Sequence, residues 1–159
     1  MQHILRALAG YPETARLLAA WPEQQQAILD TALALQAVPA PSFEEAQRAG
    51  AVRERFSALG LADVGLDDVG NVYGRTAGRR SGGPALLISA HLDTVFPADT
   101  DLTARCDRDA GRIYAPGIGD NSLGLAALIH TAQALSEHAV QPACDIWWVA
   151  TVGEEGLGD

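Results

Sequence analysis

The sequence predicts an α/β fold in which a layered mixed sheet is flanked by helices. Apolar positions recur at helical spacing through much of the first 60 residues, and prolines divide them into segments. Two continuous apolar runs, residues 85–90 and 144–152, are typical of buried strands. The amphipathic segment 122–139 lies between these runs. Helices that alternate with apolar strands in this way indicate α/β layers.

Proline positions define the expected helices of the amino-terminal part. Segments 4–10, 12–21 and 22–38 each begin or end at a proline or at a glycine just before one, as helices often do. A fourth helix is expected within 41–61. There Ser42 and Glu45 have the spacing of a capping box, and Gly60 is suited to a C-cap.

Beyond Gly60 the pattern changes to short strands and turns. Residues 85–90 are expected to fill a sheet that is covered on both faces, because the run is apolar throughout. The strand 144–152 is expected to leave an open edge that favours self-association. The remaining expectations are a strand at 70–75, a hairpin within 101–115 that turns at 109–111, a glycine-rich loop at 116–124 and a helix at 122–139.

Length and charge limit the possible functions. The 159 residues correspond to about one domain, with 1–60 mainly helical and 61–159 α/β. A formal net charge of -9 argues against general attraction to nucleic acid or to anionic membranes. No apolar run approaches the roughly 20 residues of a membrane span, and the amino terminus does not have the pattern of a signal peptide. A cytoplasmic location is therefore expected.

The apolar run 85–90 ends in a histidine and, two positions later, an aspartate. Residues i and i+2 of a strand point to the same side, so His91 and Asp93 should project together. The carboxyl end of a strand is where open α/β sheets place their sites. A carboxylate beside a histidine can orient the ring and raise its basicity as a metal ligand. The alternative is a strand-end histidine that is merely satisfied by a neighbouring acid.

Two further apolar elements have acidic residues at their ends. Asp120 comes just before the helix 122–139, where the helix dipole favours its ionised form, and it could bridge two metal ions. Alternatively, Asp120 and Asn121 only cap that helix. Glu154 and Glu155 follow the strand 144–152. If their backbone is extended, one carboxylate binds metal while the other faces substrate; otherwise they form a solvated acidic turn.

Other motifs do not support a competing site. The glycines of 116–124 lack the spacing of a dinucleotide loop, and Ser89 has no nucleophile-elbow context. His130 and His138 are expected to be surface or packing residues. By contrast, three apolar elements each have polar, metal-capable residues at corresponding ends. These residues are His91 with Asp93, Asp120, and Glu154 with Glu155. Their co-occurrence predicts a metal site.

The ordered motifs "SAHLDTV", "GIGDNSLG" and "VGEEGLG" resemble those of a known family. This is the two-zinc metallopeptidase family of peptidase T, acetylornithine deacetylase, aminoacylase and glutamate carboxypeptidase, and the resemblance covers roughly 38–159. It implies that His91, Asp120 and Glu155 are metal ligands, with Asp120 bridging two zinc ions. It also implies catalytic roles for Glu154, as general base and acid, and for Asp93, which orients His91. Cobalt or manganese would also suit such ligands.

The resemblance implies zinc-dependent hydrolysis of peptide or N-acyl amide bonds, most closely that of a peptidase T-like di- or tripeptidase. Its substrate would be a small peptide or an N-acyl amino acid. The family's catalytic domain is longer, contains a lid domain, and adds an acidic ligand and a histidine further along. The chain is therefore expected to be the amino-terminal portion of a truncated zinc-exopeptidase catalytic domain, inactive by itself. The alternative is a non-catalytic metal-binding or self-associating domain, which could form a homo-oligomer.

Overall fold

The computed structural model describes residues 10–80 and 82–157. The expected helix at 4–10 lies almost entirely outside this range. The single helix expected at 22–38 is divided, because a 3₁₀ turn precedes its α-helical part. None of the described helices is long and apolar enough to cross a membrane. The helices are α2 (Pro12–Ala20), η1 (Trp21–Gln24), α3 (Gln25–Gln36), α4 (Ala46–Ala58), the short irregular η2 (Ile118–Ser122) and α5 (Leu123–Glu137).

The main sheet has four strands in the order β1-β2-β6-β3. β3 pairs parallel to β6, whereas β2 pairs antiparallel to both β1 and β6, so the predicted mixed sheet is confirmed. β4 and β5 form the separate hairpin that the sequence predicted. The strands are β1 (Ala62–Leu66), β2 (Val72–Thr76), β3 (Leu86–His91), β4 (Arg105–Asp107), β5 (Arg112–Tyr114) and β6 (Ile146–Thr151).

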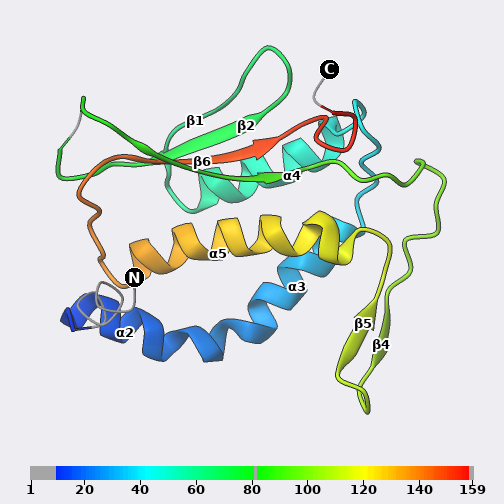
Figure 1. Ribbon diagram of the computed structural model, residues 1–159, viewed down its shortest axis with the longest axis horizontal. Coiled ribbons are helices and arrows are strands. Elements are labelled where there is room, and N and C mark those ends of the chain that lie inside the picture. The colour runs from blue at the N-terminus through cyan, green and yellow to red at the C-terminus, as the bar shows by residue number, and fades with distance from the viewer. Residues whose placement is uncertain (1–9, 81, 158–159) are drawn as a thin grey trace.

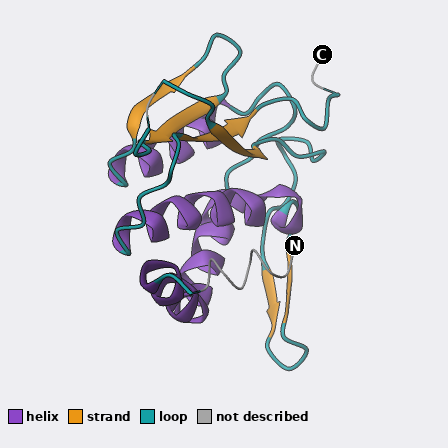
Figure 2. Cartoon of the chain, turned by 60° about the vertical axis from the view of Figure 1, so that its left-hand side comes forward, coloured by secondary structure: helices purple, strands orange, loops and turns teal. Residues whose placement is uncertain are grey.

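The molecule is built in layers, with the sheet above α4 and α5 in Figure 1 and with α2 and α3 beyond α5. α4 contacts β1 and β2, while α5 contacts β3 and β6 and packs against α3 on its other side. Figure 2 shows the β4–β5 hairpin standing away from these layers. The core between sheet and helices contains the fully buried Phe56, Val72, Leu125 and Trp148. Trp148 satisfies its indole N–H by donating to Thr76 Oγ1.

The position of β3 corrects two expectations. The open edge was expected at the strand 144–152, but β6 is central and β3 has one partner in the sheet that the described residues form. The apolar run 85–90 was expected to be covered on both faces, yet Leu86 is 48% and Leu87 is 62% exposed. Both differences have one cause: a strand at a sheet edge has fewer neighbours than its apolar sequence suggests.

Arg48 of α4 ties the helical part of the chain to the sheet. Its side chain is 1% exposed, and its guanidinium donates to the carbonyls of Val38 and Leu92. Burial lowers the pKa of Arg48 to about 10, although the negative charge of Asp93 acts in the opposite direction. The guanidinium thereby fixes the loop before α4 beside the carboxyl end of β3.

Candidate metal centre

His91 is the last residue of β3, and its ring lies between two carboxylates. Its side chain is 11% exposed. Nδ1 is 3.2 Å from the backbone oxygen of Asp93 and 3.3 Å from Asp93 Oδ1. Nε2 is 2.9 Å from Asp120 Oδ1 and 3.9 Å from Glu154 Oε2. The buried side of the ring therefore faces Asp93, and the open side faces the acidic residues.

Asp93 is a fully buried carboxylate with three hydrogen-bond donors. Ser42 Oγ donates at 2.7 Å, and the backbone amides of Glu154 and Glu155 donate at 3.1 and 2.9 Å. Burial by itself would raise the pKa of Asp93, but these hydrogen bonds together outweigh it and hold the pKa below its usual value. An ionised Asp93 can fix both the imidazole of His91 and the backbone that carries the two glutamates.

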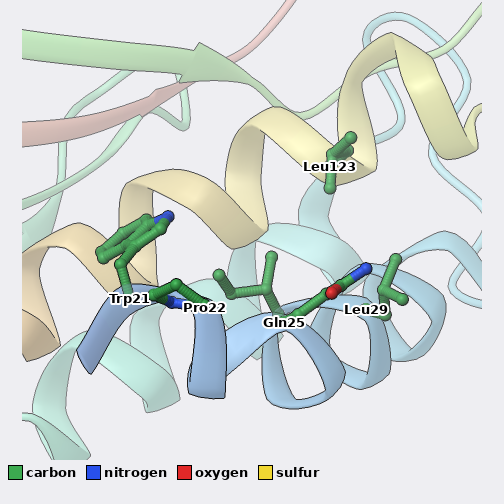
Figure 3. Close-up of a pocket in the computed structure, with 6 residues that line it drawn as sticks. Trp21, Pro22, Gln25, Leu29 and Leu123 are labelled. Atoms are coloured by element: carbon green, nitrogen blue, oxygen red, sulfur yellow. The ribbon is translucent and has the colours of Figure 1, made fainter. Parts of the chain in front are cut away.

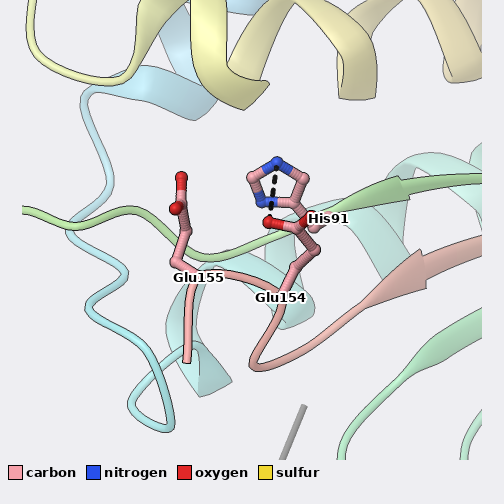
Figure 4. A group of neighbouring side chains, drawn as sticks. All are labelled: His91, Glu154 and Glu155. Carbon is pink, nitrogen blue, oxygen red and sulfur yellow. Dashed lines mark ion pairs between the residues drawn. The ribbon is translucent and has the colours of Figure 1, made fainter. Parts of the chain in front are cut away.

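The backbone of the two glutamates is a turn, which corrects the expectation based on an extended chain. Gly153 has a φ of +68°, a conformation suited to glycine, and 154–157 form a turn. As a result, both carboxylates reach the space beside His91 (Figure 4). One ligand atom from each of His91, Glu154 and Glu155 lies within 4.8 Å of the others. The structure therefore brings these three residues together, with both glutamate carboxylates toward His91 rather than on opposite sides of the chain.

Asp120 lies in the irregular η2 turn rather than at the cap of α5. The N-cap of that helix is Ser122, and Asp120 has non-helical backbone angles. Its side chain is 77% exposed and meets His91 instead of a helix amide. The capping alternative therefore does not describe Asp120. The structure places its carboxylate against His91 but outside the three-residue cluster with the glutamates.

The donor set has the composition that divalent transition metals prefer. One imidazole nitrogen and several carboxylate oxygens converge on the open side of His91. Nitrogen and oxygen ligands of this kind suit zinc, cobalt or manganese, and a histidine ligand is commonly oriented by a carboxylate on its other nitrogen. Asp93 stands at that other nitrogen. The residues present therefore fit a metal ion.

Ser42 and Glu45 are site residues that sequence reasoning missed. The capping-box expectation is wrong, because no side chain caps α4. Ser42 donates to Asp93, and Glu45 Oε1 accepts hydrogen bonds from the amides of Phe43 and Gly153. The only sequence signal for Ser42 and Glu45 is a serine followed three positions later by a glutamate. Such a local motif does not reveal partners that are distant in the sequence, here Asp93 and Gly153.

A second hollow in the molecule lies apart from His91 and lacks residues suited to catalysis or metal binding. An open hollow of about 290 Å³ beside α3 and α5 is lined by Trp21, Pro22, Gln25, Ile28, Leu29 and Leu123 (Figure 3). This lining is mostly apolar and includes no ionisable side chain. It therefore offers no metal ligand and no acid or base. His130 is buried in α5, as a packing residue should be.

Comparison with known proteins agrees with this geometry. Residues 87–159 match the profile of peptidase family M20/M25/M40. This stretch of the chain is therefore similar to that family, as its motifs predicted. Carboxypeptidase G2 of Pseudomonas sp. (strain RS-16) is 33% identical over 86 residues, which are 54% of this chain and 20% of that protein.

Solved structures of an aminopeptidase and of a tripeptidase share the fold. A tripeptidase from Staphylococcus aureus subsp. aureus Mu50 is 31% identical with a TM-score of 0.68 over 84% of this chain. The aminopeptidase PepT from Bacillus cereus ATCC 10987 is 24% identical with a TM-score of 0.71 over 84% of this chain, a likeness of fold. In both cases the match spans 38% of the solved chain. The chain thus corresponds to much less than the full length of these relatives.

Proposed function

We propose that this chain provides part of the site of a metal-dependent peptidase that hydrolyses peptide or N-acyl amide bonds. The observation that carries the proposal is the convergence of His91, Glu154 and Glu155 within 4.8 Å, with Asp93 behind the imidazole. The relation to the M20 family supports hydrolysis of this general kind. Similarity to a tripeptidase and to PepT supports a di- or tripeptide substrate.

Each residue has a role that its surroundings allow. His91 and Glu155 would hold metal, and Asp120 would bridge two ions. Asp93 would orient His91, to which it lies at 3.3 Å. Glu154 is 61% exposed on its side chain and stands beside the imidazole, so it can take a proton from water and return it to the leaving amine.

Zinc is the proposed metal, with two ions in a complete site and with cobalt or manganese as substitutes. A bound divalent ion would lower the pKa of water and polarise the substrate carbonyl. A site with two metal ions is supported by a similar structure, the YXEP protein of Bacillus subtilis, which is described as a dinuclear metal-binding peptidase. The chain's own contribution is a set of oriented carboxylates and one oriented imidazole.

We expect the 159-residue chain by itself to hydrolyse little or no peptide, because it spans 38% of the tripeptidase it resembles. A second candidate function, self-association, is favoured by the free edge of β3 with its exposed Leu86 and Leu87. An experiment distinguishes peptide hydrolysis from self-association as the function: a polypeptide that carries the remaining catalytic region of a related peptidase is added to the chain. Release of an amino acid from a tripeptide in that mixture supports the first candidate.

Zinc titration of the purified chain by calorimetry tests the metal site directly. Asp120→Ala should weaken zinc binding by more than about tenfold, since loss of a direct ligand costs at least as much as loss of an outer hydrogen-bond partner. Asp109→Ala is the matched control, because it removes an exposed aspartate of the β4–β5 hairpin, which stands away from the layers that carry the site. Equal zinc affinity in wild type, Asp120→Ala and His91→Ala would refute the site assignment.

A further inference from the structure

We infer that Glu45 is a positioning residue of the metal site: its buried carboxylate holds the turn that presents Glu154 and Glu155. The inference rests on the proposed function, because it concerns the same proposed site. Glu45 is not a member of the cluster of ligand atoms that the described residues form. It acts through the backbone of Gly153, which leads into the turn.

Glu45 holds two backbone amides through one buried carboxylate oxygen. Its Oε1 accepts hydrogen bonds from Gly153 N at 3.0 Å and from Phe43 N at 2.8 Å, and the residue is 4% exposed. Hydrogen bonds from amides to an ionised carboxylate are stronger than those to a neutral acceptor. Glu45 directly precedes α4, whose Ala49 and Val52 are buried in the core. This carboxylate is therefore fixed to a rigid element.

Phe43 supports the same turn by packing. A Cβ added to Gly153 would lie 3.0 Å from Phe43 Cε1, and one added to Gly156 would lie 2.6 Å from Phe43 Cζ. The ring therefore lies directly against both glycines. Phe43 itself has a φ of +70°, which is uncommon for an aromatic residue and is characteristic of functional segments. The segment 42–45 thus contacts the turn through a ring and a carboxylate, and it contacts Asp93 through Ser42.

Three consecutive amides of this turn each donate to a buried carboxylate. Gly153 N donates to Glu45, while Glu154 N and Glu155 N donate to Asp93. The Glu154 side chain is nevertheless 61% exposed, so side-chain packing does little to fix where it points. The backbone anchors supply that orientation before any metal binds, which is how a preorganised site is built.

A purely local role for Glu45 does not fit these contacts. It occupies the N-cap position of α4 but makes no capping hydrogen bond to that helix. Instead, its acceptor oxygen is used by a residue 108 positions away. The glutamate therefore serves the turn rather than the helix that it precedes.

The test compares Glu45→Ala and Glu45→Gln with the control Glu44→Ala, which removes the adjacent, exposed glutamate. Hydrogen exchange of the Gly153, Glu154 and Glu155 amides is measured by NMR in the metal-free chain. Affinity for Co²⁺ and the visible spectrum of bound Co²⁺ are measured in parallel. Exchange at Trp148, in the buried strand β6, reports whether the fold is intact.

Glu45→Ala should speed exchange at Gly153 and its two neighbours while Trp148 stays protected. It should also weaken Co²⁺ binding by about tenfold, as loss of a supporting hydrogen-bond partner does at metal sites. Glu45→Gln keeps an acceptor oxygen but loses the charge that strengthens the bond, so it should recover only part of that loss, and Glu44→Ala should match wild type. If Glu45→Ala unfolds, faster Gly153 exchange and weaker Co²⁺ binding in Glu45→Gln carry the test.

Wild-type exchange at Gly153 in Glu45→Ala, or wild-type Co²⁺ affinity and spectrum in that variant, would overturn the inference. A wild-type chain that binds no Co²⁺ would count against the proposed function instead. In that case the exchange measurements still decide whether Glu45 holds the turn, so the two failures are distinguishable.

Discussion

At the scale of single residues, Asp93 connects the two sides of the candidate site. Its carboxylate faces the Nδ1 side of His91 and accepts both glutamate amides. A neutral side chain of similar shape could not hold all of these groups as strongly, because charge-assisted hydrogen bonds are about twice as strong as neutral ones. The buried charge is tolerated because its donors offset the cost of burial, as its lowered pKa reflects.

His130 makes stability depend on pH. Burial lowers the pKa of His130, and the opposing effects of Ala27 and Glu137 do not cancel it. The unfolded chain, with a histidine pKa of about 6.5, therefore binds the proton first. Stability should be complete above about pH 6.5 and should fall as the pH drops below it, by at most about 1.4 kcal/mol per pH unit. His130→Gln should remove this part of the slope in urea unfolding measured from pH 7 to 5.

Thr31→Val is the control for this pH effect. Thr31 Oγ1 lies 2.9 Å from His130 Nε2, so the variant removes a hydrogen bond but leaves the histidine buried. The pH slope should persist in Thr31→Val, because burial is its main cause. An unchanged slope in His130→Gln would show that other groups produce the pH dependence.

At the scale of elements, the segment between β2 and β3 passes very close to the chain before β6. A Cβ on Gly78 would lie 2.2 Å from the carbonyl carbon of Cys144, which is backbone and cannot rotate away. Gly78→Ala should therefore destabilise the fold by about 2 kcal/mol or more, as overpacking does. Denaturant unfolding of the purified variant measures this change.

Gly50→Ala is the matched control for that substitution. Gly50 lies in α4, and a Cβ there would meet nothing within 4 Å. Because alanine favours helix more than glycine, this variant should gain up to about 1 kcal/mol. Equal stability of the two variants would show that the contact between Gly78 and Cys144 is not as close as described.

Helices and strands could be predicted largely from local patterns, whereas the partners of particular side chains could not. The prolines and apolar spacing correctly indicated α2, α3, α4 and α5, and the apolar run at 144–152 correctly indicated β6, which spans Ile146–Thr151. Ser42 and Glu45 were misread because their spacing is also that of a helix cap. Only long-range folding, which brings Asp93 and Gly153 beside them, reveals their use.

At the scale of the whole molecule, the β3 edge predicts self-association. Within residues 10–80 and 82–157, one side of β3 has no strand partner, and the strand carries the exposed Leu87 with no lysine or proline to discourage pairing. Sedimentation of the purified chain should show association that increases with concentration. Leu87→Lys should reduce it, with little effect on stability, because the side chain is 62% exposed.

Leu66→Lys tests whether the effect belongs to β3 alone. Leu66 is 38% exposed on β1, at the opposite edge of the sheet. The pairing of β1 with β2 is irregular between Ala62 and Gly65, and such irregularity discourages further strand addition. Association should therefore survive Leu66→Lys. Loss of association in this variant but not in Leu87→Lys would assign the contact to β1.

The overall architecture could be predicted, but the order of the strands could not. Alternating helices and apolar strands are enough to indicate α/β layers, and polar residues after apolar strands are enough to indicate a site. Which strand lies at the edge depends on pairing between distant segments, so the apolar sequence of 86–91 did not reveal its exposure. The turn that orients the carboxylates of Glu154 and Glu155 also depends on contacts between distant segments, so the sequence did not reveal it.

The long separation between Glu45 and Gly153 also has a consequence for biosynthesis. Their hydrogen bond spans 108 positions, and that between Asp93 and Glu155 spans 62. A ribosome adds about 5–20 residues per second, so Glu45 and Asp93 are made seconds before the turn amides that they hold. Until the glutamate turn emerges, the nascent chain carries these two acceptors without the three amides of Gly153, Glu154 and Glu155. Because the proposed site includes Glu154 and Glu155, the candidate site can be completed only after translation has passed residue 155.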